Sequence, residues 1–172
     1  RHLLMLRSKL TFDQLVGFNI QYGEDQSPVQ TIPGCSGWAS ALCSNHVMRS
    51  GRHFAVFMCS GRTKIGVTQP VKIDRSDFDD IDLIHFSPGM PMFREYLRGK
   101  RTGRWRDSDV HCCYVFTGGI SNWFDWESDP PLARTIDGFQ HDAPIGLLLD
   151  LDEGTLSVYQ NGQRLVLLKD GL

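Results

Sequence analysis

The feature that most constrains the fold is the stretch DAPIGLLLDLDEGTLSVYQNGQRLVLL, which spans residues 142–168. Two turn signals divide it into three runs that are rich in apolar residues. The pair Asn161-Gly162 is the strongest hairpin signal in the chain, because both residues tolerate the positive φ angles of a type I′ turn. A second turn is expected at residues 152–155. The stretch therefore predicts three consecutive antiparallel strands.

These two turns also set an expected register. It places six apolar side chains in two cross-strand rows, Leu149/Val158/Leu165 and Leu151/Leu156/Leu167. Because side chains alternate faces along a strand, we expect all six on one buried face, with Ser157 and Asp150 on the other. A shift of one residue would turn the whole set to solvent, so the pattern specifies the register strongly.

The composition fits one soluble globular domain. The chain has 172 residues, of which 41% are hydrophobic and 22% are charged, and its net charge is −2. Such a charge gives the whole molecule no electrostatic attraction to nucleic acid or to a membrane surface. No apolar run approaches the roughly 18 residues that a membrane-spanning helix needs. The scattered 17 glycines and 8 prolines favour many turns and an all-β fold.

Cysteine usage indicates a compartment. The five cysteines are an odd number without regular spacing, and the chain has no N-x-S/T glycosylation site. These features favour a reducing, intracellular environment, cytoplasmic or nuclear, with free thiols.

Further motifs precede the C-terminal stretch. They are GWASALC (37–43), SGRHFAVFMCSG (50–61), KIGVTQPV (64–71), HCCYVFT (111–117) and ISNWFDW (120–126). Together with GLLLDLDEGTLSVYQNG they resemble the SPRY domain family over residues 37–171. The resemblance implies a two-sheet antiparallel β-sandwich of the concanavalin or jelly-roll type, with variable loops that bind a peptide, and it implies no catalytic chemistry and no cofactor.

Within the second motif, residues 54–59 predict a strand with two apolar faces. Phe54, Val56 and Met58 point one way, and Ala55, Phe57 and Cys59 point the other. Two apolar faces are expected of a central strand that is covered on both sides.

The resemblance also suggests a domain layout. We expect residues 1–33 to form an N-terminal extension and residues 34–172 to form the SPRY-like domain. SPRY domains usually continue beyond the KDG at residues 169–171 into another strand, whose loss would leave a sheet edge or an apolar groove uncovered. We therefore expect a truncated C-terminal end, or a strand supplied by the N-terminal segment. Residues 72–109 are expected to be an irregular insertion whose acidic first part pairs with its basic second part.

The resemblance points to protein recognition. We expect the chain to bind a short peptide of a partner protein, as a substrate-recruiting or adaptor part of a larger protein. Exposed aromatic and arginine side chains dominate binding hot spots. The candidate contacts on the loops and on residues 111–126 are Arg104, Trp105, Arg106, Tyr114, Trp123 and Trp126.

Nucleic-acid binding is the first alternative. The run REYLRGKRTGRWR at residues 94–106 is basic and aromatic, so it could contact phosphates while Trp105 stacks on a base. The basic side chains that would act are Arg98, Lys100, Arg101 and Arg104. A charged surface loop balanced by the nearby aspartates explains the same run.

A thiol hydrolase is the second alternative. The motif GCSGW at residues 34–38 places Cys35 beside a tryptophan, but its order differs from the thiol-protease signature. A catalytic thiol would also need a histidine base, for which His46, His53, His111 and His141 are available. A turn before a strand explains the motif more simply.

No metal site is expected. The sequence DLDEG at residues 150–154 partly matches an EF-hand loop, but its glycine stands at position 5 rather than 6, and a hairpin explains each residue. The aspartates of residues 74–82 lack the glycine and glutamate of a calcium loop. Cys112 and Cys113 are adjacent, so in a strand they point to opposite faces and cannot chelate one ion.

Overall fold

The structure is a computed structural model of the 172-residue chain. It describes residues 10–17, 19–23, 28–35, 37–43, 45–71, 73, 86–102, 110–126 and 133–172. The chain divides into two compact units, one of residues 1–47 with 72–87 and one of residues 48–71 with 88–172.

The first unit contains two short antiparallel strand pairs. Its strands are β1 (Gln14–Val16), β2 (Ile20–Tyr22), β3 (Val29–Thr31) and β4 (Ser40–Leu42). β1 pairs with β4, and β2 pairs with β3. The buried Asn19 holds the β1–β2 connection. Its side-chain Nδ2 donates to the Gly37 carbonyl at 3.0 Å, and its backbone carbonyl accepts the Ile32 N–H at 2.9 Å. Residues 37–43, expected to begin the sandwich, thus contribute β4 to this unit instead.

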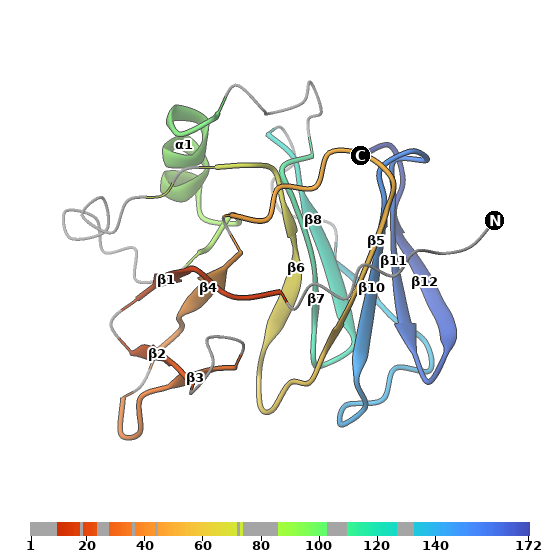
Figure 1. Ribbon diagram of the computed structural model, residues 1–172, viewed down its shortest axis with the longest axis horizontal. Helices are drawn as coiled ribbons and strands as arrows, with labels where there is room; N and C mark the ends of the chain where they lie inside the picture. Colours follow the sequence, from red (N-terminus) through yellow and green to blue (C-terminus); the bar gives the residue numbers. More distant parts are fainter. Residues whose placement is uncertain are drawn as a thin grey trace. The chain divides into compact units, whose positions relative to one another are not determined.

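The second unit contains the sandwich. Its elements are β5 (Arg52–Phe57), β6 (Lys64–Thr68), α1 (Pro91–Gly99), β7 (Cys112–Phe116), β8 (Ile120–Phe124), β9 (Ala133–Thr135), β10 (Ile145–Asp150), β11 (Thr155–Gln160) and β12 (Gln163–Lys169). The strands form two four-stranded antiparallel sheets, in the orders β12-β11-β10-β5 and β6-β7-β8-β9. Figure 1 shows the two sheets side by side within this unit.

The core of the second unit lies between these two sheets. The buried apolar side chains come from both, with Ile65, Cys113 and Val115 on one side and Leu147, Leu156 and Val158 on the other. Full burial of a side chain of this size contributes about 2 kcal/mol to stability. The described part of the chain is therefore an all-β antiparallel sandwich with one short helix, and the predicted fold class is confirmed at this level.

The C-terminal meander confirms the predicted strands and corrects their register. Gln160 pairs with Gln163, and the turn residues between them have φ angles of 52° and 77°, as a type I′ turn requires. The first turn, however, spans residues 151–154, so Leu149 pairs with Leu156 instead of Val158. A shift of two residues keeps the inward face inward.

Two irregularities in the β11–β12 ladder change the outcome for one predicted core residue. The register shifts between Leu156 and Ser157 and again between Val158 and Tyr159. As a result Leu167 pairs with Ser157 on the outer face, where it is 41% exposed, so its predicted place in the core was wrong. The other five predicted residues are buried or pack against the core, and Ser157 lies on the outer face as predicted.

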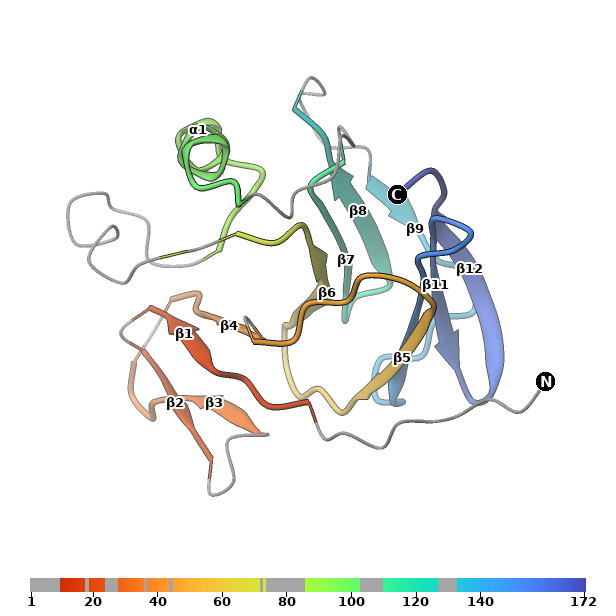
Figure 2. The ribbon, with the colours of Figure 1, turned by 45° about the horizontal axis from the view of Figure 1, so that its top comes forward.

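Helix α1 lies within residues 72–109, which we expected to be irregular, and this expectation was wrong for this part. Pro91 stands in the first turn, where its missing N–H costs nothing. Phe93 and Leu97 are four residues apart, share one helix face and are fully buried. Figure 2 looks nearly along the helix axis. No helix in the described ranges is long and apolar enough to cross a membrane.

Candidate protein-interaction surface

The outer face of the sheet β12-β11-β10-β5 carries exposed apolar side chains. Along β5 and just beyond it, every second residue faces outward, and Phe54, Val56 and Met58 are 49%, 58% and 77% exposed. The register continues this face across the sheet, from Phe54 through Leu148 and Ser157 to Leu167. We call Phe54, Val56, Met58, Leu148, Tyr159 and Leu167 the outer apolar face. The prediction that both faces of this strand are covered was therefore wrong.

Gly146 makes room for the aromatic part of the outer apolar face. It pairs with Tyr159 on one side and with Val56 on the other. A Cβ at this glycine would lie 2.8 Å from Cζ of Phe54 and 3.2 Å from Cβ of Tyr159. Without it, the two rings meet edge to face with centroids 5.9 Å apart, a favourable aromatic geometry. The face is thus ordered in advance of any contact.

The same strand is the edge of its sheet. Among the described residues β5 pairs only with β10. The Leu151 N–H donates to the Gly51 carbonyl at 3.0 Å, so Gly51 and Leu151 are a hydrogen-bonded pair of this antiparallel ladder. Hydrogen-bonded pairs recur at every second residue from there. His53, Ala55 and Phe57 therefore turn their backbone groups toward β10. The alternate residues, Arg52, Phe54 and Val56, turn theirs toward the edge.

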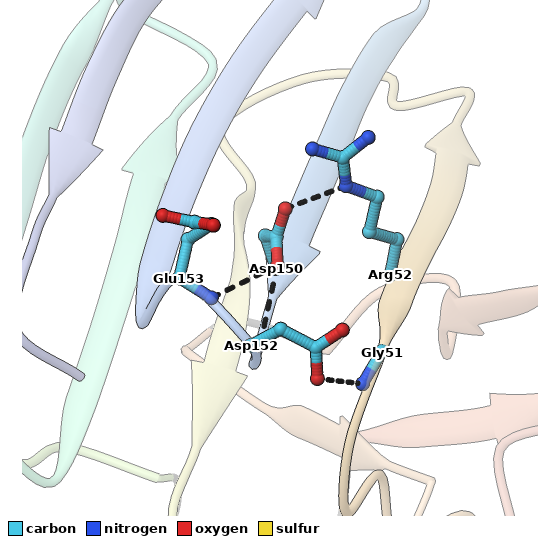
Figure 3. A network of polar contacts seen from close by, with 5 residues as sticks. All are labelled: Gly51, Arg52, Asp150, Asp152 and Glu153. Atoms are coloured by element: carbon cyan, nitrogen blue, oxygen red, sulfur yellow. Dashed lines mark hydrogen bonds and ion pairs between the residues drawn. The ribbon is translucent and has the colours of Figure 1, made fainter.

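A polar network fixes the start of β5, as Figure 3 shows. Nε of Arg52 donates to Oδ2 of Asp150 at 2.6 Å, and the Asp152 carboxylate accepts the Gly51 N–H at 2.8 Å. Oδ1 of Asp150 also accepts the N–H groups of Asp152 and Glu153. The hydrogen bond from Arg52 is the main cause that lowers the pKa of Asp150. Within this network, the carboxylates of Asp150, Asp152 and Glu153 outnumber the single guanidinium of Arg52, and all three raise the pKa of that guanidinium.

Tyr114 and Trp123, two of the predicted contact residues, do not share a surface. Cys113 pairs with Trp123 and Tyr114 pairs with Asn122, so the two aromatic residues lie on opposite faces of the sheet. Tyr114 is half-buried, and burial raises the pKa of its hydroxyl to about 12. Trp123 packs against the core.

Both aromatic rings already have cationic neighbours within the chain. Nζ of Lys64 lies 5.0 Å from the Tyr114 ring centroid. The guanidinium of Arg134 lies 5.0 Å from the Trp123 ring centroid, and Nζ of Lys169 lies 5.9 Å from it. Cation–π contacts of this kind stabilise the positions of the rings.

Trp126, the third of these residues, is the centre of a separate cluster with α1. Its ring stacks on His111 with centroids 4.2 Å apart, and the guanidinium groups of Arg101 and Arg98 lie 4.5 Å and 5.1 Å from its centroid. Nη2 of Arg98 also donates to the Trp126 carbonyl at 3.0 Å. Three side chains thus pack on this indole. The remaining predicted contacts, Arg104, Trp105 and Arg106, lie outside the described residues.

His111 is the most perturbed base in this cluster. Its ring is almost fully buried, and burial lowers its pKa to about 4, with smaller contributions from Arg94 and Arg101. The Asp125 backbone carbonyl opposes this shift, although neither ring nitrogen has a partner at full hydrogen-bonding geometry. The side chain is therefore neutral at physiological pH, and its ring packs against the indole of Trp126.

A shallow hollow of about 280 Å³ lies at one end of the sandwich, where the loops after β5, β7 and β9 meet. Thr117 ties two of these loops together, since its hydroxyl accepts the Thr63 N–H at 3.0 Å and donates to the Gly61 carbonyl at 2.8 Å. Cys59 lines the hollow, and burial raises the pKa of its thiol, which keeps it protonated. These loops are held firmly, as a rigid scaffold for binding requires.

The remaining candidates for chemistry have structural explanations. Asp150 ends β10 and residues 151–154 form the β10–β11 turn, so the hairpin interpretation of DLDEG is confirmed. Cys35 is exposed in a turn closed by its own N–H, which donates to the Ile32 carbonyl at 3.1 Å. Cys112 and Cys113 lie on opposite faces, and burial raises the pKa of both thiols. The described residues bring no three potential ligands together around a metal, while the acidic run 74–80 with Asp82 lies outside them.

Comparison of the chain with family models, with curated proteins and with solved structures finds no match.

Proposed function

We propose that this chain is a non-catalytic, SPRY-type interaction module that binds a segment of a partner protein, as an intracellular adaptor or substrate-recruiting part of a larger protein. The observation that carries the proposal is the outer apolar face, where four large side chains are at least 41% exposed on one sheet. A contiguous exposed apolar surface of this kind is typical of a protein-binding site.

Two further features support the proposal. Five of the six sequence motifs that resemble the SPRY family lie on strands of the sandwich, and SPRY domains serve as recognition modules. The rigid two-sheet scaffold, together with the pre-ordered Phe54–Tyr159 pair, means that little conformational entropy is lost on binding. The predicted contacts Tyr114, Trp123 and Trp126 pack within the chain, so the proposal places the first contact on the outer apolar face.

The proposal is tested with two matched double variants. Val56→Ser/Met58→Ser removes two exposed apolar side chains from the outer apolar face, and Met92→Ser/Ile120→Ser removes two that are exposed elsewhere. Proteins captured from a cell lysate by wild type and by each variant are quantified by mass spectrometry, and affinities are then measured with a purified captured protein. We expect the first variant to bind at least about tenfold more weakly, as loss of a hot spot predicts. Equal loss with both variants, or unchanged binding by the first, contradicts the proposal.

Nucleic-acid binding through residues 94–106 is a second candidate, favoured by four basic side chains on and after α1: Arg94, Arg98, Lys100 and Arg101. Stacking on Trp126 does not support it, because His111, Arg98 and Arg101 already pack on that ring. Contact with phosphates would make affinity fall steeply with salt. If RNA and DNA binding is the same for wild type and an Arg101→Glu/Arg104→Glu variant, this candidate is removed.

A further inference from the structure

We infer that the outer apolar face takes an extended segment of a partner protein that adds to β5 as an antiparallel strand, with apolar side chains at alternate positions and a basic residue at its C-terminal end. This inference deepens the proposed function and rests on it. An edge strand offers a row of backbone donors and acceptors to another chain. Strand addition of this kind is a recurring mode of peptide recognition.

The backbone of β5 is suited to this mode. Because the Gly51–Leu151 hydrogen bond fixes the ladder, Arg52, Phe54 and Val56 direct both their N–H and their C=O groups to the edge. These three residues can form hydrogen bonds with alternate residues of an incoming strand. No other strand among the described residues pairs with this edge.

The apolar side chains belong to the same residues. In an antiparallel pair, residues that face one another place their side chains on the same side of the sheet, about 5 Å apart. Partner residues bonded to Phe54 and Val56 would therefore place their own side chains on the outer apolar face. One added strand would satisfy the edge and cover the exposed parts of Phe54 and Val56 together.

Charge gives the incoming strand a direction. At the Arg52 end of β5, the carboxylates of Asp150 and Asp152 contact Arg52 and Gly51, and the Glu153 carboxylate lies farther away, beyond Asp150 (Figure 3). The neighbours already in this sheet are all antiparallel. An antiparallel strand added to the free edge would have its C-terminal end at the Arg52 end of β5, across that strand from these carboxylates, which is why a basic residue is expected there.

The test uses the synthetic peptide ETVTITVTK, labelled with a fluorophore, and measures its binding to the full chain by fluorescence anisotropy. Its valine and isoleucine residues would face outward and would direct their amides to β5. N-methylation of those amides should weaken binding at least about tenfold, whereas N-methylation of the threonine amides should leave it within a factor of about two. The peptide KTVTITVTE has the same composition with the end charges exchanged, and it should bind severalfold more weakly.

Several results overturn the inference. Equal effects of the two N-methylated peptides exclude backbone pairing with β5, and equal or tighter binding of KTVTITVTE excludes the antiparallel direction. A free-chain dimer that Val56→Ser/Met58→Ser dissociates in sedimentation equilibrium assigns the edge to a second copy. Loss of peptide binding in a longer chain that continues past residue 172 assigns the edge to a further strand of the protein itself. If Val56→Ser/Met58→Ser loses binding to its cellular partner, but neither the N-methylated peptides nor the charge-exchanged peptide behaves as expected, strand addition is excluded and the proposed function is retained. If Val56→Ser/Met58→Ser binds the cellular partner as tightly as wild type does, both strand addition and the proposed function are contradicted.

Discussion

The rings of Phe54 and Tyr159 meet edge to face over Gly146, with the two centroids 5.9 Å apart, on a face of the sheet where Phe54 is 49% exposed. This relationship joins β5 to β11 across the intervening strand β10. It also distinguishes the outer apolar face from the core, because a ring in the core would have neighbours on all sides.

Phe54→Ala should therefore cost much less stability than truncation of a core residue. We expect a loss of about 1 kcal/mol for Phe54→Ala, against about 2–5 kcal/mol for Leu156→Ala, whose side chain is fully buried. Urea denaturation of the two variants measures the difference. Equal losses would mean that another part of the molecule covers Phe54 in solution.

Gly66→Ala should be among the most damaging small substitutions in the chain. A Cβ at this position would lie 2.0 Å from the Cys113 carbonyl oxygen and 2.7 Å from Cα of Tyr114, and backbone atoms cannot move aside cheaply. We expect a loss of at least about 2 kcal/mol. Gly99→Ala is the matched control, because its Cβ meets nothing within 4 Å. Thermal unfolding should show Gly66→Ala well below wild type and Gly99→Ala equal to it or above.

His111 should make the fold less stable in mild acid. Its folded pKa is lowered to about 4, and its unfolded pKa is about 6.5, so between these values the unfolded state binds a proton that the folded state does not. The contribution falls as pH drops from 6.5 to 4, by about 1–3 kcal/mol in total.

The variant His111→Phe keeps an aromatic ring beneath Trp126 and cannot bind this proton. Its free energy of unfolding should therefore change less than that of wild type between pH 6.5 and 4, as urea titrations at several pH values would show. Parallel curves for the two proteins would mean that His111 is hydrated in the folded state.

Asp150 should contribute stability above the ordinary carboxyl pKa. Arg52 lowers its folded pKa, so the contribution is complete above about 4 and is lost as pH falls through the lowered value. Asp150→Asn should be less stable than wild type at pH 7, and the two proteins should converge in stronger acid. Glu153→Gln is the control, since only the Glu153 backbone N–H enters the network. A constant difference at all pH values would contradict this account.

The sequence predicts the strands of the sandwich well, because turn residues and alternation are local signals. The turn at Asn161-Gly162 follows from the positive φ angles that both residues adopt. The sequence does not predict the register, because the irregularities in the β11–β12 ladder arise from packing and no residue type in these strands indicates them. Leu167 was misplaced for that reason.

Helix α1 could have been found. Pro91 followed by Phe93 and Leu97 is a helix start with an apolar pair four residues apart. The many charged residues around this pair led to the prediction of an irregular insertion. A polar composition favours a loop, but periodicity is the more direct sign of secondary structure, and in this segment the periodicity is decisive.

The candidate surface was harder to predict. Alternation in RHFAVFM identifies two apolar faces, but it does not say whether both are covered. Whether a strand is central or at an edge is a property of the whole sheet, and neighbours far apart in sequence decide it. The general enrichment of aromatic residues in binding hot spots favours Tyr114, Trp123 and Trp126 instead, and these residues pack within the chain.

Residue-resolved hydrogen exchange on the free chain tests the central claim most directly. If β5 is a bare edge beneath an exposed apolar face, the amides of Arg52, Phe54 and Val56 should exchange at least about a hundredfold faster than those of His53, Ala55 and Phe57. Uniform protection along all six residues would contradict the account, because it would mean that another strand already occupies the edge.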